Sequence, residues 1–231
     1  MNKVFLAVPC SNLSCNPDII GPIIVASPKN QLSAFKTSSY ALLARNFNEL
    51  FCAALNARKN GITHFCMLHS DIAPHGVGWL DIMLDEMESV NADILSAVVP
   101  IKSHQGLTST AIDESVEGSN PLWRPRRLSM QEIIEKYKET FTVDKLLVNT
   151  GLMLVDIRRS WVNEIYFETK DIILRDSSGN FFAENAPEDW MFSRQARLMH
   201  ASIFATRKIG VTHYGHQGWL NIQQIEGNKN G

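Results

Sequence analysis

Short apolar runs alternate with longer amphipathic segments along the first hundred residues. The short runs have the length and the β-favouring composition of buried strands, and the longer segments repeat apolar side chains at helical spacing. Strands are expected at residues 3–8, 65–68 and 93–99, and helices at 38–60 and 77–89. This order predicts a parallel sheet with right-handed crossovers and a crevice at the carboxyl ends of its strands.

The second half of the chain has a less regular pattern. A capping-box pair, Ser129 and Glu132, indicates a helix to about residue 137. Pro187 followed by two acids indicates a helix to about residue 200. The segment 176–180 is rich in Asp, Ser, Gly and Asn and predicts a hairpin turn. Further strands are expected at residues 108–112, 145–148, 151–155 and 203–209.

Composition and charge are those of an ordinary globular protein. The 231 residues are 45% hydrophobic and 20% charged, with a formal net charge of −2. These values suit one large domain or two small ones and argue against general nucleic-acid binding. Cys52 and Cys66 lie in apolar segments, so we expect reduced core thiols and a cytoplasmic setting. The apolar run at 3–8 is too short for a signal-peptide core, and no membrane span is expected.

Four polar clusters stand immediately beside predicted buried elements: His69-Ser70-Asp71, Asn149-Thr150-Gly151, Glu188-Asp189-Trp190, and His213 with His216. Each cluster has a purely structural interpretation, because Asp is common in turns and acids suit a helix N-terminus. A carboxylate at the carboxyl end of a central strand is nevertheless well placed to hold a divalent cation. Such a cation can neutralise a diphosphate.

The order of these segments resembles the GT-A-fold glycosyltransferases, and most closely the family 2-like enzymes of bacteria and phages. The resemblance covers roughly residues 4–219. The matching segments are Arg45-Asn46, residues 63–72, residues 96–102, Glu188-Asp189-Trp190 and His213-Tyr214-Gly215.

The resemblance implies an α/β fold of the GT-A type, a Rossmann-like mixed sheet with flanking helices. It also implies a single catalytic domain, residues 1–225. Residues 1–102 would form its nucleotide-binding half, residues 103–225 its acceptor-binding half, and residues 226–231 a frayed tail.

For the donor, the resemblance implies that Asp71 and His213 hold Mn²⁺ or Mg²⁺, with His216 as an alternative ligand; an imidazole ligand favours Mn²⁺. The remaining donor contacts are assigned to Pro9, Arg45, His69 and Lys102. His69 stands where the family usually has an acid, and this departure bears on metal dependence.

For the acceptor, the resemblance implies that Asp189 is the general base of an inverting transfer, with Glu188 as the second choice. Trp190 would offer an aromatic face to a sugar ring. The residues expected to line the substrate are Asn149, Thr150 and Gly151. The same three residues with a terminal His also resemble retaining enzymes, so both stereochemical outcomes stay open. The implied donors are UDP- or GDP-sugars. The acceptor would be a glycan, a protein or a modified nucleobase, the last disfavoured by the weak net charge.

Two other functions compete with this hypothesis. A nucleotidyltransferase would share the sheet, the strand-end acid and the metal, but it normally has a Gly-rich basic loop for a triphosphate. The segment 9–16 contains no Gly, Lys or Arg. A non-catalytic sugar- or nucleotide-binding module of the same fold is the other alternative, and the departure at His69 keeps it open.

Overall fold

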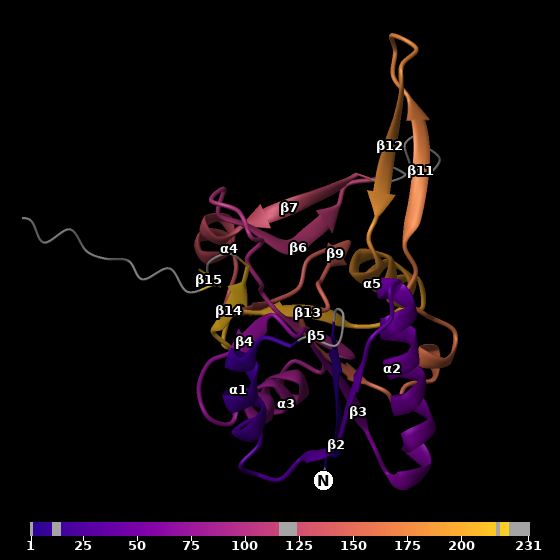
Figure 1. The fold of residues 1–231 in the computed structure, drawn as a ribbon. Coiled ribbons are helices and arrows are strands. Elements are labelled where there is room, and N and C mark those ends of the chain that lie inside the picture. The colour runs from indigo at the N-terminus through magenta and orange to yellow at the C-terminus, as the bar shows by residue number, and fades with distance from the viewer. Residues whose placement is uncertain (1, 11–14, 116–123, 216–217, 222–231) are drawn as a thin grey trace, which may run out of the picture.

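A computed structural model describes residues 2–10, 15–115, 124–215 and 218–221; His216 and the predicted tail 226–231 lie outside these ranges. A seven-stranded mixed sheet runs through the molecule in the order β2-β1-β3-β10-β5-β13-β8 (Figure 1). Its strands are β1 (Val4–Pro9), β2 (Leu32–Ser38), β3 (His64–Leu68), β5 (Ile94–Ala97), β8 (Thr140–Phe141), β10 (Leu152–Asp156) and β13 (Ile203–Thr206).

The strands predicted in the first hundred residues, β1, β3 and β5, all run in the same direction, as predicted, but a later strand lies among them. Strand β1 is parallel to β3, and it is also parallel to β2 on its other side. Strand β10, however, lies between β3 and β5 and is antiparallel to both. Strands from residues 1–102 and from residues 103–225 therefore share one sheet. The mixed sheet that the resemblance implies is therefore confirmed, but the apolar pattern of the first hundred residues could not show where a later strand inserts.

Helices cover both faces of the sheet, and alternating side chains of each inner strand point to one face or the other. The helices are α1 (Ile20–Ile24), α2 (Leu43–Ala57), α3 (Trp79–Ser89), α4 (Met130–Lys136) and α5 (Glu188–Leu198), with 3₁₀ turns η1 (Pro17–Ile19), η2 (Arg58–Asn60) and η3 (Ser160–Asn163). In β3, Phe65 and Met67 join the core under α2 and α5, whereas Cys66 and Leu68 join the core under α3.

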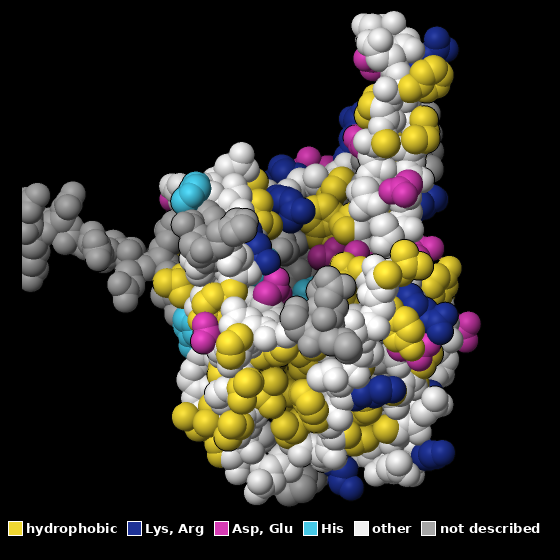
Figure 2. All heavy atoms as spheres, in the orientation of Figure 1, with side chains coloured by type: hydrophobic (Ala, Val, Ile, Leu, Met, Phe, Trp, Pro, Cys, Tyr) yellow, Lys and Arg dark blue, Asp and Glu magenta, His cyan; other side chains and the backbone are white. Residues whose placement is uncertain are grey.

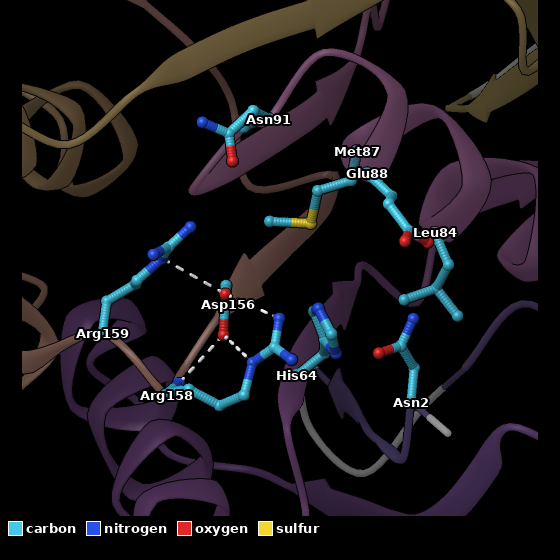
Figure 3. Close-up of a pocket in the computed structure, with 10 residues that line it drawn as sticks. Asn2, His64, Leu84, Met87, Glu88, Asn91, Asp156, Arg158 and Arg159 are labelled. Atoms are coloured by element: carbon cyan, nitrogen blue, oxygen red, sulfur yellow. Dashed lines mark hydrogen bonds and ion pairs between the residues drawn. The ribbon is translucent and has the colours of Figure 1, made fainter.

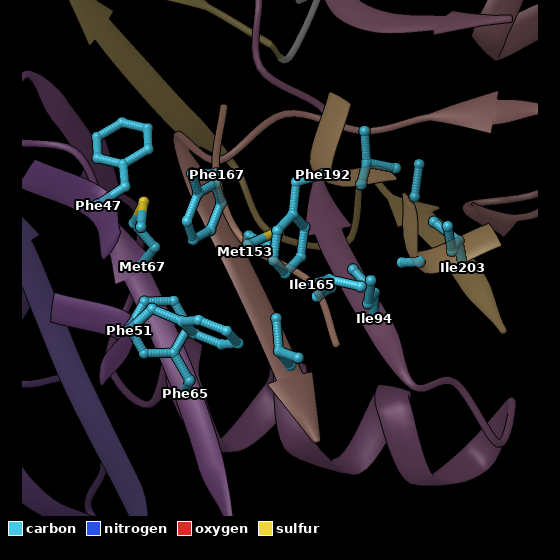
Figure 4. Close-up of a cluster of buried hydrophobic side chains, with 14 of the residues drawn as sticks. Phe47, Phe51, Phe65, Met67, Ile94, Met153, Ile165, Phe167, Phe192 and Ile203 are labelled. Atoms are coloured by element: carbon cyan, nitrogen blue, oxygen red, sulfur yellow. The ribbon is translucent and has the colours of Figure 1, made fainter. Parts of the chain in front are cut away.

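The core under α2 and α5 is rich in aromatic side chains (Figure 4). The rings of Phe167 and Phe192 stack with centroids 4.3 Å apart, and Phe51 meets both edge-on at 5.7 Å. Phe47 is fully buried in the same core, and its ring centroid lies 5.1 Å from that of His69. The core thus reaches directly beneath the polar cluster that follows β3.

Several local predictions are confirmed, and two are wrong. Ser129 caps α4 by accepting a hydrogen bond from the Glu132 amide at 3.0 Å. Helix α2 begins at residue 43 rather than 38, because residues 32–38 form the edge strand β2, which the apolar pattern did not indicate. Cys52 is exposed on the outer side of α2 and is not a core thiol. Cys66 is buried, and its burial raises the pKa of its thiol.

Three smaller sheets are attached to the main one, in the orders β15-β14-β4, β7-β6-β9 and β11-β12. Their strands are β4 (Ile72–Pro74), β6 (Leu107–Asp113), β7 (Pro125–Ser129), β9 (Leu146–Leu147), β11 (Lys170–Arg175), β12 (Phe181–Ala186), β14 (Val211–Tyr214) and β15 (Gly218–Leu220). The predicted hairpin β11-β12 is present and projects away from the body next to α5 (Figure 1). In the described part of the chain, no helix is long and apolar enough to cross a membrane.

Candidate active site

The site begins at the carboxyl end of β3, where the chain turns through His69, Ser70 and Asp71 into the short strand β4. Strand β14 pairs antiparallel with β4 and places His213 opposite Ile72. The amide of Tyr214 donates to the carbonyl of Asp71 at 2.8 Å. Because of this pairing, Nε2 of His213 lies 3.4 Å from Oδ2 of Asp71.

Lys102 supplies the charge that faces Asp71. Its Nζ lies 2.6 Å from Oδ2 of Asp71, and both side chains remain more than one-third exposed. Gly215 leaves room for the lysine stem, since a Cβ at that position would come within 3.0 Å of the Lys102 Cδ. Burial alone would raise the pKa of Asp71, but its interactions with His213 and Lys102 outweigh burial and hold the pKa well below its usual range. Asp71 is therefore a carboxylate at any physiological pH.

The hydrogen bond made by Nδ1 of His213 determines whether Nε2, which faces Asp71, carries a proton in the neutral ring. Nδ1 lies 2.8 Å from the carbonyl oxygen of Pro100. A carbonyl only accepts, so Nδ1 must donate this hydrogen bond. In the neutral ring, Nε2 then carries a lone pair directed at the Asp71 carboxylate, and these two groups attract each other only with a proton or a cation between them.

His69 is held in place by the turn that precedes β10, the strand next to β3. Its Nε2 lies 3.0 Å from Oγ1 of Thr150, and its backbone amide donates to the carbonyl of Gly151 at 2.8 Å. Burial lowers the pKa of His69 to about 4, which makes the imidazole neutral.

The turn before β10 is itself tied down by Asn149, which is 3% exposed. The Asn149 amide donates to the carbonyl of Ala97 at 3.0 Å, and its Oδ1 accepts from the Gly151 amide at 2.9 Å. A Cβ on Gly151 would come within 3.0 Å of that oxygen. Asn149, Thr150 and Gly151 thus form hydrogen bonds within the protein, and through them they position His69.

A cavity of about 340 Å³ opens beside this cluster. Its lining includes Pro9, Cys10, Asn46, Phe47, His69 and Asp71. Figure 2 shows acidic and basic side chains gathered in the middle of this face, below the projecting hairpin. Arg45 forms an ion pair with Glu49 at 2.6 Å, and its guanidinium lies over the ring of Tyr40. Its neighbour Asn46 lines the cavity, and only its place next to Arg45 in the helix could have indicated this from the sequence.

Helix α5 brings two carboxyl groups to the same end of the sheet. Ser193 of α5 hydrogen-bonds both the amide and the carbonyl of Val148 at 3.1 Å, directly before the turn that holds His69. Glu188 and Asp189 form the first turn of α5. Burial, reinforced by the charge of Glu188, raises the pKa of Asp189 to about 7, and burial also raises the pKa of Glu188. A carboxyl group with a pKa near 7 suits proton transfer at neutral pH.

Arg127 of β7 is the cation next to Asp189, and no sequence signal singled it out. Its guanidinium lies 4.5 Å above the ring of Trp190 and donates to the carbonyl of Thr108 at 3.2 Å. Its positive charge lowers the pKa of Asp189 and so partly opposes the effect of burial. Trp190 is 5% exposed, and its indole N–H donates to the carbonyl of Ser109 at 2.8 Å. Arg127 therefore covers one face of the indole ring.

The residues around Asp71 offer two of the ligands that a divalent cation needs. Neighbouring ligands of one ion, each about 2.1 Å from it, lie roughly 3.0–3.4 Å apart, which matches the separation of Asp71 and His213. Among the described residues, no group of three or more His, Cys, Asp or Glu side chains could hold a metal ion. Asp71 and His213 thus offer one oxygen and one nitrogen ligand, and the rest of the shell of an ion held there would have to come from substrate phosphates and water.

The opposite end of β3 and β10 carries a second polar cluster around a cavity of about 150 Å³ (Figure 3). Asp156 is buried there and forms ion pairs with Arg158 at 2.7 Å and Arg159 at 3.3 Å. Arg159 also pairs with Asp93 at 2.6 Å, and His64 stands beside Asp156 in the sheet. These interactions tie β3, β10 and the start of β5 together, so we interpret this cluster as structural.

Comparison with known proteins identifies the fold of this chain but does not assign it to a family. No family model matches the sequence, and neither does any curated protein. Among solved structures, A197 from STIV is similar over 92% of this chain and 86% of its own length, with a TM-score of 0.56 and 13% identity. S. aureus TarS gives a TM-score of 0.47 at 13% identity over 89% of this chain and 35% of that chain. An apo UDP-glucose pyrophosphorylase gives 0.39 at 9% identity over 94% and 75%.

The likeness to A197 shows the fold alone, and the two looser likenesses carry no argument. The predicted fold class is confirmed: the chain has an α/β fold of the GT-A type, with a large mixed sheet and flanking helices.

Proposed function

We propose that this protein is a glycosyltransferase that moves a sugar from a nucleotide-diphosphate sugar to an acceptor hydroxyl. One observation carries the proposal: Asp71, Lys102 and His213 converge at the end of β3, beside a cavity large enough for part of a nucleotide. In open α/β sheets, ligands bind in the crevice at such strand ends.

The donor is assigned to the cavity side of this cluster. Breaking a sugar–diphosphate bond builds negative charge on the departing nucleoside diphosphate, and a cationic group must lie next to that charge. Lys102 is the protein cation already present. Pro9 and Asn46 line the cavity in which the nucleoside would lie, and neutral His69 forms its floor with Phe47. UDP- and GDP-sugars are the donor candidates.

Asp71 and His213 would hold Mn²⁺ or Mg²⁺, as their separation suits two ligands of one ion. When bound, the ion would supply Lewis-acid stabilisation of the diphosphate leaving group. His216, outside the described residues, is a candidate for a further ligand.

Asp189 would take the proton from the acceptor hydroxyl, and Glu188 is the second candidate for this role. The acceptor oxygen then bonds to the anomeric carbon while the bond from that carbon to the phosphate oxygen breaks. The proton stays on Asp189, and the electron pair leaves with the nucleoside diphosphate. The raised pKa of Asp189 supports this role. With Asp189 acting as the base on the face opposite the leaving group, the reaction would be inverting.

The test is a panel of UDP- and GDP-sugars incubated with the protein and glycan, protein and nucleic-acid acceptors, with Mn²⁺ or with EDTA. The proposal expects release of nucleoside diphosphate together with glycosylated acceptor. Release of nucleoside triphosphate when pyrophosphate is supplied would instead show a nucleotidyltransferase. Donor binding without turnover on any acceptor would show a binding module of the same fold.

A further inference from the structure

One oxygen of the Asp71 carboxylate, Oδ2, contacts two neighbouring side chains. Oδ2 contacts the Lys102 ammonium at 2.6 Å, and the same oxygen faces Nε2 of His213 at 3.4 Å. A divalent cation held between Asp71 and His213 would therefore lie beside the lysine ammonium, and two positive groups on one carboxylate oxygen repel each other strongly.

We propose that Lys102 is an exchangeable counter-ion: it neutralises Asp71 in the metal-free protein, and a divalent cation must displace it in order to bind. The inference rests on the proposed function, because it assumes that Asp71 and His213 hold the cation. It adds a role for Lys102 that the fold does not imply, which is to set the affinity and the order of cation binding.

The surroundings of Lys102 permit this exchange. Its side chain is 39% exposed, so its stem can turn outward without breaking a packed core. The stem passes over Gly215, where a Cβ would come within 3.0 Å of Cδ and 3.6 Å of Cγ. A side chain at residue 215 would therefore crowd the lysine in the position from which it reaches Asp71. Once released, the ammonium would lie next to the bound cation and could contact a donor phosphate.

The first experiment measures Mn²⁺ binding by electron paramagnetic resonance of free Mn²⁺, with no nucleotide present. Lys102→Met removes the competing ammonium, and we expect Mn²⁺ to bind about fivefold more tightly than in the wild type, since partly exposed ion pairs have modest strength. Gly215→Ala keeps the charge but pushes the stem aside, and a smaller tightening of about twofold is expected. Asp71→Asn should lose binding.

The matched control is Lys136→Met, which removes a surface lysine that pairs with Glu132 at 3.2 Å. It should leave Mn²⁺ affinity unchanged. If Lys102→Met binds Mn²⁺ no more tightly than the wild type, the exchange does not occur. If Lys136→Met tightens binding as much as Lys102→Met does, only the net charge matters, and the direct exchange on Asp71 is again overturned.

The second experiment observes the lysine itself. Acetylation of the native protein by a limiting reagent, followed by peptide mass spectrometry, reports how accessible each amine is. Mg²⁺ should raise the acetylation rate of Lys102 several-fold and leave that of Lys136 unchanged. An unchanged rate at Lys102 while Mg²⁺ is bound would contradict the proposal. If no variant binds a cation but the wild type transfers sugar in EDTA, the exchange fails while the proposed transferase stands.

Discussion

The two ends of β3 and β10 carry polar clusters that resemble each other in composition and differ in how completely they are paired. At one end, buried Asp156 is held by Arg158 and Arg159 through ion pairs of 2.7 and 3.3 Å. At the other, Asp71 is paired with Lys102 yet remains 37% exposed beside a cavity.

The difference teaches how a polar cluster can be assigned to structure or to function. A buried carboxylate whose lone pairs are all occupied by arginines holds strands together and has no capacity left for a ligand. A partly exposed carboxylate whose ion pair is open to solvent can exchange its partner for a cation or a substrate. Histidines of lowered pKa stand at both ends, His64 and His69, so a perturbed pKa alone does not distinguish the two clusters.

The largest expected effect comes from removing the carboxylate charge at each end in turn, first at Asp71 and then at Asp156. Asp71→Asn should lower sugar transfer by at least about a hundredfold, because the group that organises the cations at the diphosphate is gone. It should change the free energy of unfolding by less than about 1 kcal/mol, since the ion pair is partly exposed.

Asp156→Asn, the matched variant, should behave in the opposite way. We expect a loss of about 2–4 kcal/mol in the free energy of unfolding, because two arginines lose a buried partner. Activity per folded molecule should be unchanged. Urea unfolding and kcat should be measured for both variants. If Asp156→Asn lost activity while keeping its stability, and Asp71→Asn lost stability while keeping its activity, the functional and structural assignments of the two ends would be reversed.

The next effect concerns proton transfer at Asp189. Because a general base must be deprotonated, kcat/KM should rise with pH through about 7, the value to which burial raises the pKa of Asp189. Asp189→Asn should lower kcat by about a hundredfold or more and abolish this rise.

Arg127→Met sharpens that prediction. Arg127 lowers the pKa of Asp189, so its removal should move the rise in kcat/KM to higher pH. A pH profile of the variant that coincides with the wild type would show that the rise belongs to another group.

A smaller effect is expected on stability in acid. Burial lowers the pKa of His64 to about 4, so below pH 6.5 the unfolded chain binds a proton that the native protein does not. The free energy of unfolding should therefore fall as pH decreases from 6.5 to 4, by up to about 3 kcal/mol for this group. His64→Asn should flatten this part of the stability curve.

His200→Asn is the control, because His200 is exposed and has a φ of 62°, which Asn tolerates well. Its stability curve between pH 6.5 and 4 should match that of the wild type. An equal flattening in both variants would show that burial of His64 is not the cause.

The smallest effect is expected at the border of the cavity. Arg45 is engaged by Glu49 and Tyr40, so Arg45→Met should change the KM for a nucleotide sugar by less than about threefold. A tenfold increase in KM would mean that Arg45 leaves Glu49 to bind the donor.

The sequence could predict those features that depend on residues close together in the chain, and it could not predict those that depend on pairing between distant segments. The strand before His69, the capped helix after Ser129 and the helix that opens at Glu188 depend on neighbours in sequence, and all three are present. The insertion of β10 between β3 and β5 depends on pairing between distant segments, which no local pattern encodes.

The same distinction applies within the site. Asp71 could be noticed because it ends a buried strand, and Asp189 because it opens a helix. The hydrogen bond of Thr150 to His69 and the position of Arg127 over Trp190 arise only when distant elements pack together. Residues of the turn 149–151 could be listed as substrate contacts from a motif, but the sequence could not show that they hold His69 in place.

The most direct test of the account is to follow the imidazole signals of His213, His69 and His64 by NMR while UDP or GDP is added with Mg²⁺. Variants with each His replaced by Gln would assign the signals. The account predicts that the signals of His213 and His69 move on saturation by one of the two nucleotides and that the signal of His64 does not. Movement of the His64 signal alone, or unmoved signals at millimolar concentrations of both nucleotides, would contradict it.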